Sequence, residues 1–246
     1  PSAVKRSSNR SCDPAFIALT AELRAPLLAV PHGEATHVAG PIQGSGTYVL
    51  EAAAATLLAP EDKLLVLING AYGERMAAIA RRLGRAVTLL RWAEDQPVDP
   101  AAVEAALAAD PAITHVTIVH CETTTGLLNP IESVAVIVAD AGSNMIVDAM
   151  ASFGALPIDL STLPAAAILA SSNKCLEGTP GLAFALIERA VLESCAGCSA
   201  SMSLDLHAQW LGFESNGQWR FTPPVQVVAA RAMDAFALFE ADAIIA

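Results

Sequence analysis

A single lysine, Lys174, occupies a position where its amine could do covalent chemistry. It lies in the loop of residues 171–181, which is rich in small and turn-forming residues and separates two apolar runs, 165–170 and 182–187. Such runs are typical of buried strands, and a lysine beside them is uncommon unless it is paired or chemically used. A desolvated lysine amine can form a Schiff base with an aldehyde. The alternative is a surface loop whose lysine points into water.

Asp148 is the second candidate, because it follows the apolar run 145–147 directly. A carboxylate at the end of a buried strand needs a cationic partner or several hydrogen bonds. Lys174 could supply that partner in a buried ion pair. A protonated pyridine nitrogen is the other candidate, and the residues alone leave both alternatives open.

A group of four small residues, Gly-Ser-Gly-Thr at 44–47, precedes a predicted helix over 48–58. Such residues leave backbone N–H groups exposed at the positive end of the helix dipole, and this arrangement binds phosphate. Neither nucleotide motif is present, because no Gly-Lys-Ser/Thr follows and Val49 replaces the third glycine of the dinucleotide fingerprint. The alternative is an ordinary helix start capped by serine or threonine.

The elements that must position these residues alternate along the chain. Apolar runs predict strands at 64–68, 86–90, 116–119, 145–147, 165–170 and 182–187. Helices are predicted at 15–23, 48–58, 74–83 and 130–139, and residues 97–108 are predicted to be a loop followed by a helix. Most strands are continuously apolar, which indicates a mainly parallel sheet with helices on both faces. The short last loop predicts one antiparallel strand. Ligands of such α/β sheets bind beyond the carboxyl ends of the strands, where polar residues cluster: Asn69, Tyr72, Glu122, Thr123, Asp148, Asn173 and Lys174.

The first predicted helix has a clear start, with Asp13 as its N-cap and Pro14 at its first position. A turn-rich stretch with two histidines, His32 and His37, comes next. We interpret each of these histidines as a surface residue rather than a ligand.

Composition limits the class of protein. The 246 residues are 54% hydrophobic, which predicts a substantial core, and the formal net charge of −11 argues against nucleic-acid and acidic-membrane partners. No apolar run reaches the ~18 residues of a membrane span. Five cysteines without a framework spacing suit a reducing cytoplasm, and the lone Cys195-Ala196-Gly197-Cys198 motif lacks the second pair of a metal site. We therefore expect a soluble cytoplasmic protein without a metal.

Taken together, these features match the needs of pyridoxal 5′-phosphate (PLP). The phosphate cradle at 44–47, the aromatic plate Tyr72, the strand-end Asp148 and the loop Lys174 supply one element each. The lysine would hold the cofactor covalently, and the aspartate would keep the ring nitrogen protonated so that the ring accepts electrons.

The chain resembles the class V branch of the fold-type I PLP-dependent aminotransferases, and within it the 2-aminoethylphosphonate–pyruvate transaminases. The resemblance extends over nearly the whole chain from about Pro14. It is carried by residues 43–47, 67–75, 120–126, 147–154, 172–175, 203–206 and 219–224. The strings Asn-Gly-Ala-Tyr-Gly-Glu-Arg and His-Cys-Glu-Thr-Thr-Thr-Gly are specific to this branch. The resemblance implies the large domain of a fold-type I transferase.

The resemblance also implies a role for each matching residue. Lys174 would carry the cofactor and shuttle a proton, and Asp148 would pair with the pyridine nitrogen. The remaining cofactor contacts would be Ser45, Gly46 and Thr47 with Asn173 at the phosphate, Tyr72 on one ring face, Met150 on the other, and Thr123 beside the ring hydroxyl. Thr222 would reach the cofactor phosphate of the neighbouring subunit, which implies a homodimer.

The implied reaction moves the amino group of 2-aminoethylphosphonate to pyruvate, giving phosphonoacetaldehyde and alanine by a ping-pong cycle. The alternatives are a serine- or alanine-glyoxylate-type transaminase, a cofactor-binding relative without catalysis, and a nucleotide-binding sheet protein. Arg75 and Arg220 could contact anions or form ordinary salt bridges, and we interpret His120 as structural.

The match to the family is incomplete at both ends. We expect an N-terminal segment at 1–30, a PLP-binding large domain at 31–222, and a connecting helix at 223–246 that leads to a small C-terminal domain. The family carries an arginine for the keto-acid carboxylate in that small domain, and the chain stops at Ala246. The sequence is therefore expected to be either incomplete or a truncated form.

Overall fold

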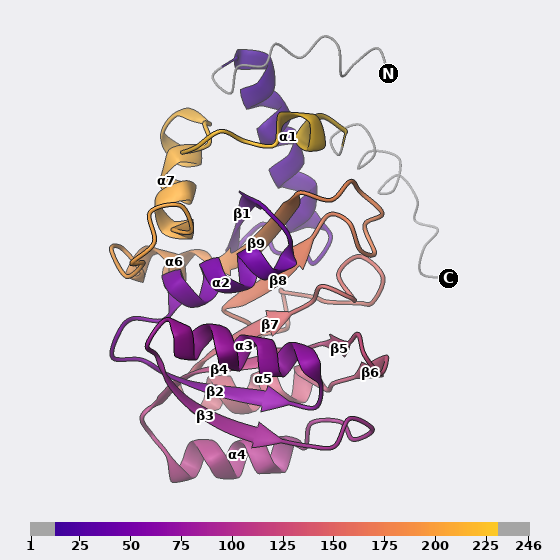
Figure 1. Cartoon of the computed structure of the whole chain (residues 1–246), viewed down its shortest axis with the longest axis vertical. Helices are drawn as coiled ribbons and strands as arrows, with labels where there is room; N and C mark the ends of the chain where they lie inside the picture. The colour runs from indigo at the N-terminus through magenta and orange to yellow at the C-terminus, as the bar shows by residue number, and fades with distance from the viewer. Residues whose placement is uncertain (1–12, 231–246) are drawn as a thin grey trace.

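A seven-stranded sheet forms the centre of the protein in the computed structural model, which describes residues 13–230 (Figure 1). The spatial order is β1 (His37–Gln43), β9 (Leu182–Glu188), β8 (Ala167–Ser171), β7 (Asn144–Asp148), β4 (Ile113–Val119), β2 (Lys63–Ile68) and β3 (Ala86–Arg91). A separate two-stranded sheet contains β5 (Cys121–Glu122) and β6 (Leu127–Leu128). The predicted α/β architecture is confirmed.

The direction of the strands also follows the prediction. Within the seven-stranded sheet β9 runs antiparallel to both of its neighbours, β1 and β8, while the other pairs are parallel. The loop of residues 172–181 between β8 and β9 is too short to carry a crossover connection, so the chain can only return antiparallel.

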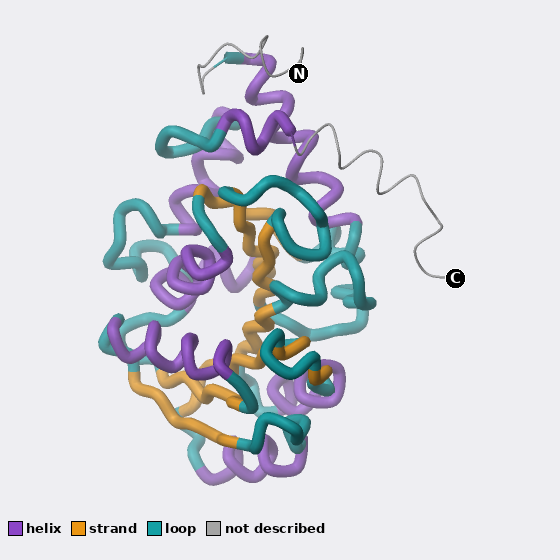
Figure 2. Tube along the Cα trace, turned by 45° about the vertical axis from the view of Figure 1, so that its right-hand side comes forward, coloured by secondary structure: helices purple, strands orange, loops and turns teal. Residues whose placement is uncertain are grey.

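Helices cover both faces of this sheet. The helices are α1 (Pro14–Ala29), α2 (Gly46–Leu57), α3 (Ala71–Arg82), α4 (Pro100–Ala109), α5 (Ile131–Asp140), α6 (Arg189–Ser194) and α7 (Leu206–Asn216). In Figure 2 the strands lie between helices on two sides. One buried cluster joins Leu65 and Leu67 of β2 to α1, α4 and α5, and the other joins Leu64 and Val66 to α2 and α3. Both faces of a central strand are thus apolar, as the continuous runs predicted.

The sequence prediction missed β1 and placed His37 wrongly. His37 opens β1 and is only 4% exposed; its Nε2 lies 2.9 Å from the Ala165 carbonyl oxygen and its Nδ1 lies 2.8 Å from Thr36 Oγ1. Burial lowers the pKa of His37. The strand was hidden by Gly40 and Pro41, and Pro41 is tolerated because β1 is an edge strand that pairs only with β9.

Several boundaries moved by a few residues. The Asp13 cap is confirmed, since its Oδ1 accepts a hydrogen bond from Ala15 N at 2.9 Å, but α1 continues to Ala29. Helix α3 begins at Ala71, three residues before the predicted start at 74. Tyr72 and Arg75 therefore both lie in the first turns of this helix.

The predicted division into segments stays a prediction. Residues 225–230 are helical, and the rest of the expected connecting helix, 231–246, lies outside the described residues. Across residues 13–230, no helix combines the length and the apolar composition needed to cross a membrane.

Candidate active site

The predicted cofactor residues meet in one cavity of about 230 Å³ at the carboxyl ends of the parallel strands. We call it the lysine cavity. It is lined by Ser45, Gly46, Thr47, Leu50, Tyr72, Arg75, Thr123, Met150, Ser171, Asn173 and Lys174. Every predicted site residue except Asp148 and Thr222 is therefore in the lining.

The N-terminus of α2 forms one wall of the lysine cavity. Ser45 is the N-cap of α2 in extended backbone, and its side chain makes no capping hydrogen bond. The first turn of α2 carries no acidic residue. The hydroxyl of Ser45 and the positive end of a twelve-residue helix thus remain available to an anion.

Arg75 and Tyr72 come together on the first turns of α3. The Arg75 guanidinium carbon lies 4.6 Å from the centre of the Tyr72 ring, and Nη1 donates a hydrogen bond to Thr47 Oγ1 at 3.5 Å. Within residues 13–230 no carboxylate lies at ion-pair distance from Arg75. Its cation is therefore directed toward the phosphate cradle.

Arg220, the other arginine considered for an anion contact, is engaged elsewhere. Its Nη1 lies 3.8 Å from Asp205 Oδ2 and donates to the Met202 carbonyl oxygen at 3.0 Å. Its guanidinium also lies over the Phe221 ring. These contacts indicate a structural role.

Asp148 lies at the end of β7 and is only 5% exposed. Its Oδ1 accepts a hydrogen bond from Met150 N at 3.0 Å. Burial raises the pKa of Asp148 to about 6; the Met150 N–H opposes the rise, the Glu122 carboxylate adds to it, and Arg75 opposes it. No ion pair joins Asp148 to Lys174 among the described salt bridges, so the buried ion pair considered from sequence is not formed.

Of the two alternatives that the sequence left open for Lys174, a desolvated amine and an exposed loop lysine, the structure has the second, because Lys174 is exposed. The physical reason is that it follows β8 by three residues and is already in the loop beyond the sheet. Ser172 anchors this loop, since its hydroxyl donates to the carbonyl oxygens of Thr179 at 2.7 Å and Leu182 at 3.0 Å. Lys174 is thus held on a fixed turn at the edge of the lysine cavity.

Thr222 is the predicted residue that the structure does not bring to the site. It is exposed in the segment that follows α7, outside the lining of the lysine cavity. Its predicted contact with a neighbouring subunit stays a prediction.

Sequence reasoning placed Glu122 and Asn69 in the polar cluster without giving either a role. The Glu122 side chain is fully buried beside the cavity. Asn69 Nδ2 donates to Asn129 Oδ1 at 2.8 Å, and Asn129 Nδ2 donates to the Val119 carbonyl oxygen at 2.8 Å, which ties the ends of β2 and β4 together. The signal for Glu122 was the one used for Asp148, an acid just beyond an apolar strand.

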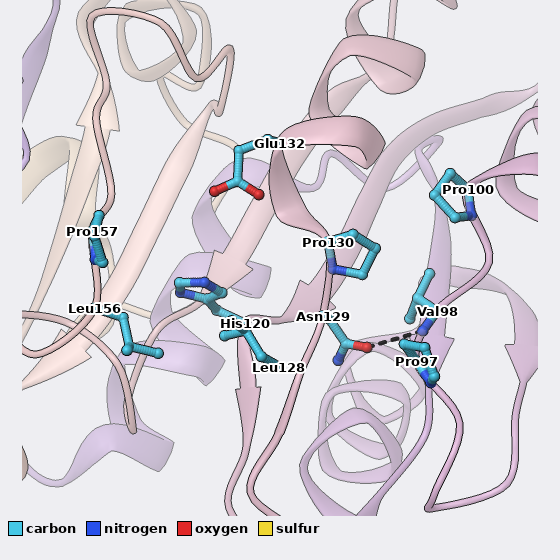
Figure 3. Close-up of a pocket in the computed structure, with 10 residues that line it drawn as sticks. All are labelled: Pro97, Val98, Pro100, His120, Leu128, Asn129, Pro130, Glu132, Leu156 and Pro157. Atoms are coloured by element: carbon cyan, nitrogen blue, oxygen red, sulfur yellow. Dashed lines mark hydrogen bonds between the residues drawn. The ribbon is translucent and has the colours of Figure 1, made fainter.

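A larger cavity of about 570 Å³ lies beside the small sheet and the start of α5 (Figure 3). We call it the histidine cavity. Its lining consists of Pro97, Val98, Pro100, His120, Leu128, Asn129, Pro130, Glu132, Leu156 and Pro157. His120 is buried with Nδ1 2.9 Å from Ser152 Oγ, and this burial lowers its pKa while Glu132 opposes the shift. With neither lysine nor arginine in its described lining, this cavity does not match the predicted chemistry.

The fold and the lysine cavity define a class of protein, and the comparison with known families agrees. The chain belongs to the class-V aminotransferase family, whose pattern matches residues 42–238. It is 54% identical over 220 residues to 2-aminoethylphosphonate–pyruvate transaminase 2 of Burkholderia lata, an alignment that covers 89% of this chain and 58% of that protein. It is 51% identical over 223 residues to 2-aminoethylphosphonate–pyruvate transaminase 1 of a Polaromonas species, covering 89% and 60%.

Solved structures show the same fold. Pyridoxamine–pyruvate aminotransferase from Mesorhizobium loti superposes with a TM-score of 0.88 at 26% identity, covering 97% of this chain and 61% of that one. Alanine–glyoxylate aminotransferase from a Nostoc species gives a TM-score of 0.89 at 25% identity, covering 97% and 64%. The chain thus spans about 60% of the length of the relatives it matches.

Proposed function

We propose that this chain forms the PLP-binding part of an aminotransferase that moves the amino group of 2-aminoethylphosphonate to pyruvate. The products would be phosphonoacetaldehyde and alanine. The observation that carries the proposal is the convergence, at one cavity, of a helix N-terminus, an aromatic ring and a lysine, with a buried aspartate beside it. Relatives at 51–54% identity are named for this reaction, whereas the alanine–glyoxylate enzyme is 25% identical.

The residues present fit PLP in charge and in position. A phosphate dianion suits the first turn of α2, where no side-chain cap or acidic residue competes for the N–H groups. Asp148 is a buried acid without an ion-pair partner among the described residues, so a cationic ring nitrogen would supply the missing charge. Lys174 keeps an exposed amine at the edge of the same cavity.

When bound, PLP supplies an electron sink for negative charge that develops on the carbon next to the substrate amine. Each residue of the chain has its own task around that sink. Lys174 would hold the cofactor and would then move a proton as general acid and base. Asp148 would hold the proton on the ring nitrogen. Around the ring and phosphate we assign Tyr72 and Met150 to the two ring faces, Thr123 to the ring hydroxyl, and Ser45, Gly46, Thr47 and Asn173 to the phosphate.

Two further assignments belong to this proposal. Thr222 would complete the phosphate site of a second copy of the chain, which makes the enzyme a homodimer. The five cysteines without a framework spacing favour the cytoplasm as its compartment.

The direct test is the visible absorbance of the purified protein with PLP. We expect a band from cofactor bound to lysine that disappears with 2-aminoethylphosphonate and returns with pyruvate. Alanine with glyoxylate is the comparison pair and should act more weakly. A band that forms and ignores 2-aminoethylphosphonate would contradict the substrate assignment, and absence of any band would contradict the cofactor.

A further inference from the structure

Glu122 is the buried acid of this site that has no assigned task. Its side chain is 0% exposed, and its Oε1 accepts a hydrogen bond from Thr124 Oγ1 at 3.0 Å. Its Oε2 is also buried and has no hydrogen-bond partner among the described residues. A buried acceptor without a partner is costly, and a charged one especially so. Such an atom in a native fold calls for an explanation.

Gly70 leaves the space that the Glu122 carboxyl group occupies. A Cβ atom on Gly70 would lie 2.3 Å from the carboxyl carbon of Glu122 and 2.6 Å from Oε2. Any side chain at position 70 would therefore displace the acid. The glycine lies immediately before α3, the helix that carries Tyr72. The buried position of Glu122 therefore depends on the absence of a side chain at residue 70.

Glu122 also lies close along the chain to the strand pair that holds Asp148. Val119 of β4 is the register partner of Asp148 of β7, and His120 N donates to the Asp148 carbonyl oxygen at 2.9 Å. Glu122 follows two residues later. The charged groups that act on Asp148 are Glu122, which raises its pKa, and Arg75, which lowers it. Neither acid has an ion-pair partner in the described part of the chain.

We infer that Glu122 is a positioning residue that acts through Asp148, strengthening the binding of a protonated pyridine nitrogen at that carboxylate. This inference rests on the proposed function, namely that the lysine cavity binds a pyridine phosphate. Two like charges in a buried site destabilise each other, and an entering cation relieves both. The second carboxylate therefore makes the site more selective for a cationic ring than Asp148 alone would be.

The pH dependence follows from the sign of this interaction. Below about pH 6 Asp148 carries a proton, which must leave when a protonated ring nitrogen binds, so affinity falls as the pH falls. Without the Glu122 charge, Asp148 keeps its own charge to lower pH. Glu122→Gln should therefore weaken binding near pH 7.5 and move the acidic fall in affinity to lower pH.

The probe is 4′-deoxypyridoxine 5′-phosphate, which has the ring nitrogen and the phosphate but no aldehyde to react with Lys174. Titration by calorimetry between pH 5 and pH 8 should show that Glu122→Gln weakens the binding of this ligand on the order of tenfold. A tenfold change in affinity corresponds to a pKa shift of about one unit. Inorganic phosphate, which has no ring, should bind both proteins equally. Glu132→Gln, which neutralises an acid of the histidine cavity, is the matched control.

A double-mutant cycle separates this role from a structural one. If Glu122 acts through Asp148, the substitution Glu122→Gln should have no effect on the ring ligand in an Asp148→Asn background. Thr124→Val removes the hydroxyl hydrogen bond to Oε1, keeps the backbone N–H contact at 3.5 Å and keeps the Glu122 charge, so it should retain the wild-type pH profile. If Glu122→Gln does not fold, Glu122→Asp keeps the charge and should retain an acidic limb near pH 6.

Three results would overturn the inference. The first is that wild type and Glu122→Gln bind the ring ligand with equal affinity. The second is that Glu122→Gln weakens the binding of the ring ligand and of inorganic phosphate by the same factor. The third is that Glu122→Gln weakens ring-ligand binding as much in the Asp148→Asn background as in wild type. A wild-type protein that binds no ring ligand would instead contradict the proposed function itself, so the two failures are distinguishable.

Discussion

The lysine cavity and the histidine cavity both include the start of a helix, and the two helix starts differ in charge. Helix α2 begins in the lysine cavity with no acid in its first turn and with Arg75 beside it. Helix α5 begins in the histidine cavity with Pro130 as its cap and Glu132 in its first turn. A side-chain carboxylate at a helix N-terminus already occupies the favourable field that an anion would use. The larger cavity is thus the poorer anion site.

Cavity volume does not determine which of the two cavities can hold an anion. The histidine cavity is more than twice as large, but proline rings and apolar side chains make up most of its lining, with one acid, one amide and a buried imidazole. The lysine cavity combines an amine, a guanidinium and free helix N–H groups. Chemistry of the lining, rather than volume, separates them.

The largest expected effect comes from removing the amine of the lysine cavity. Lys174→Ala should abolish amino transfer and the cofactor band, because no other group there can hold the aldehyde covalently. Of the three lysines in the sequence, Lys63 is the matched control, since its amine pairs with Asp110 away from both cavities. Lys63→Ala should keep the band; normal transfer by Lys174→Ala would refute the mechanism.

Asp148→Asn should lower the rate of amino transfer on the order of 10²- to 10³-fold, a loss typical of removed site electrostatics. The same change should stabilise the cofactor-free chain. A carboxyl with a raised pKa adds stability below its ordinary pKa of 3.8 and loses it as the pH rises through about 6. At pH 7.5 the asparagine should add on the order of 2–3 kcal/mol to the free energy of unfolding.

Denaturant unfolding of the two cofactor-free proteins at pH 4 and pH 7.5 measures this second effect. The stabilisation should be present at pH 7.5 and absent at pH 4. If the difference in unfolding free energy between the two proteins is the same at pH 4 and pH 7.5, the charge of Asp148 does not destabilise the folded chain.

An acid placed at the start of α2 should make the lysine cavity resemble the histidine cavity. Thr47→Glu adds a carboxylate to the first turn, and we expect PLP affinity to fall about tenfold, since a charge at a helix terminus is worth up to about 2 kcal/mol in partly buried sites. Thr47→Gln has the same size without the charge and is the control. Equal affinity of the two variants would show that the helix terminus does not hold the phosphate.

The smallest expected effect concerns His37, which was predicted to be a surface residue and is buried in the structure. Its lowered pKa means that its contribution to stability is present above pH 6.5 and is lost as the pH falls. His37→Gln should make the acid loss of stability shallower, by less than ~1 kcal/mol between pH 7 and pH 5. His32→Gln is the control, because the His32 side chain is 69% exposed. Thermal unfolding across that range is the measurement.

Most of the sheet was predictable because its central strands are buried on both faces and are therefore continuously apolar. β1 was not, because an edge strand can contain Gly40 and Pro41, and these residues imitate a turn in the sequence. Four lining residues were predictable because residues at the carboxyl ends of parallel strands meet at one edge of the sheet, namely Tyr72, Thr123, Asn173 and Lys174. The sequence left the exposure of Lys174 open, since the loop of residues 172–181 has no periodicity that fixes which way a side chain points.

By itself, the sequence determined the alternation of the central strands and helices, the single antiparallel strand and most of the residues that line the lysine cavity, while β1 and the lining residues Leu50 and Ser171 were not predicted. The predicted features follow from local patterns of apolar runs, turn residues and specific strings. The tertiary structure alone decided that Asp148 has no lysine partner, that Arg75 faces Thr47, and that Glu122 is enclosed beside Gly70. Such facts depend on contacts between segments far apart in the chain, which local patterns do not encode.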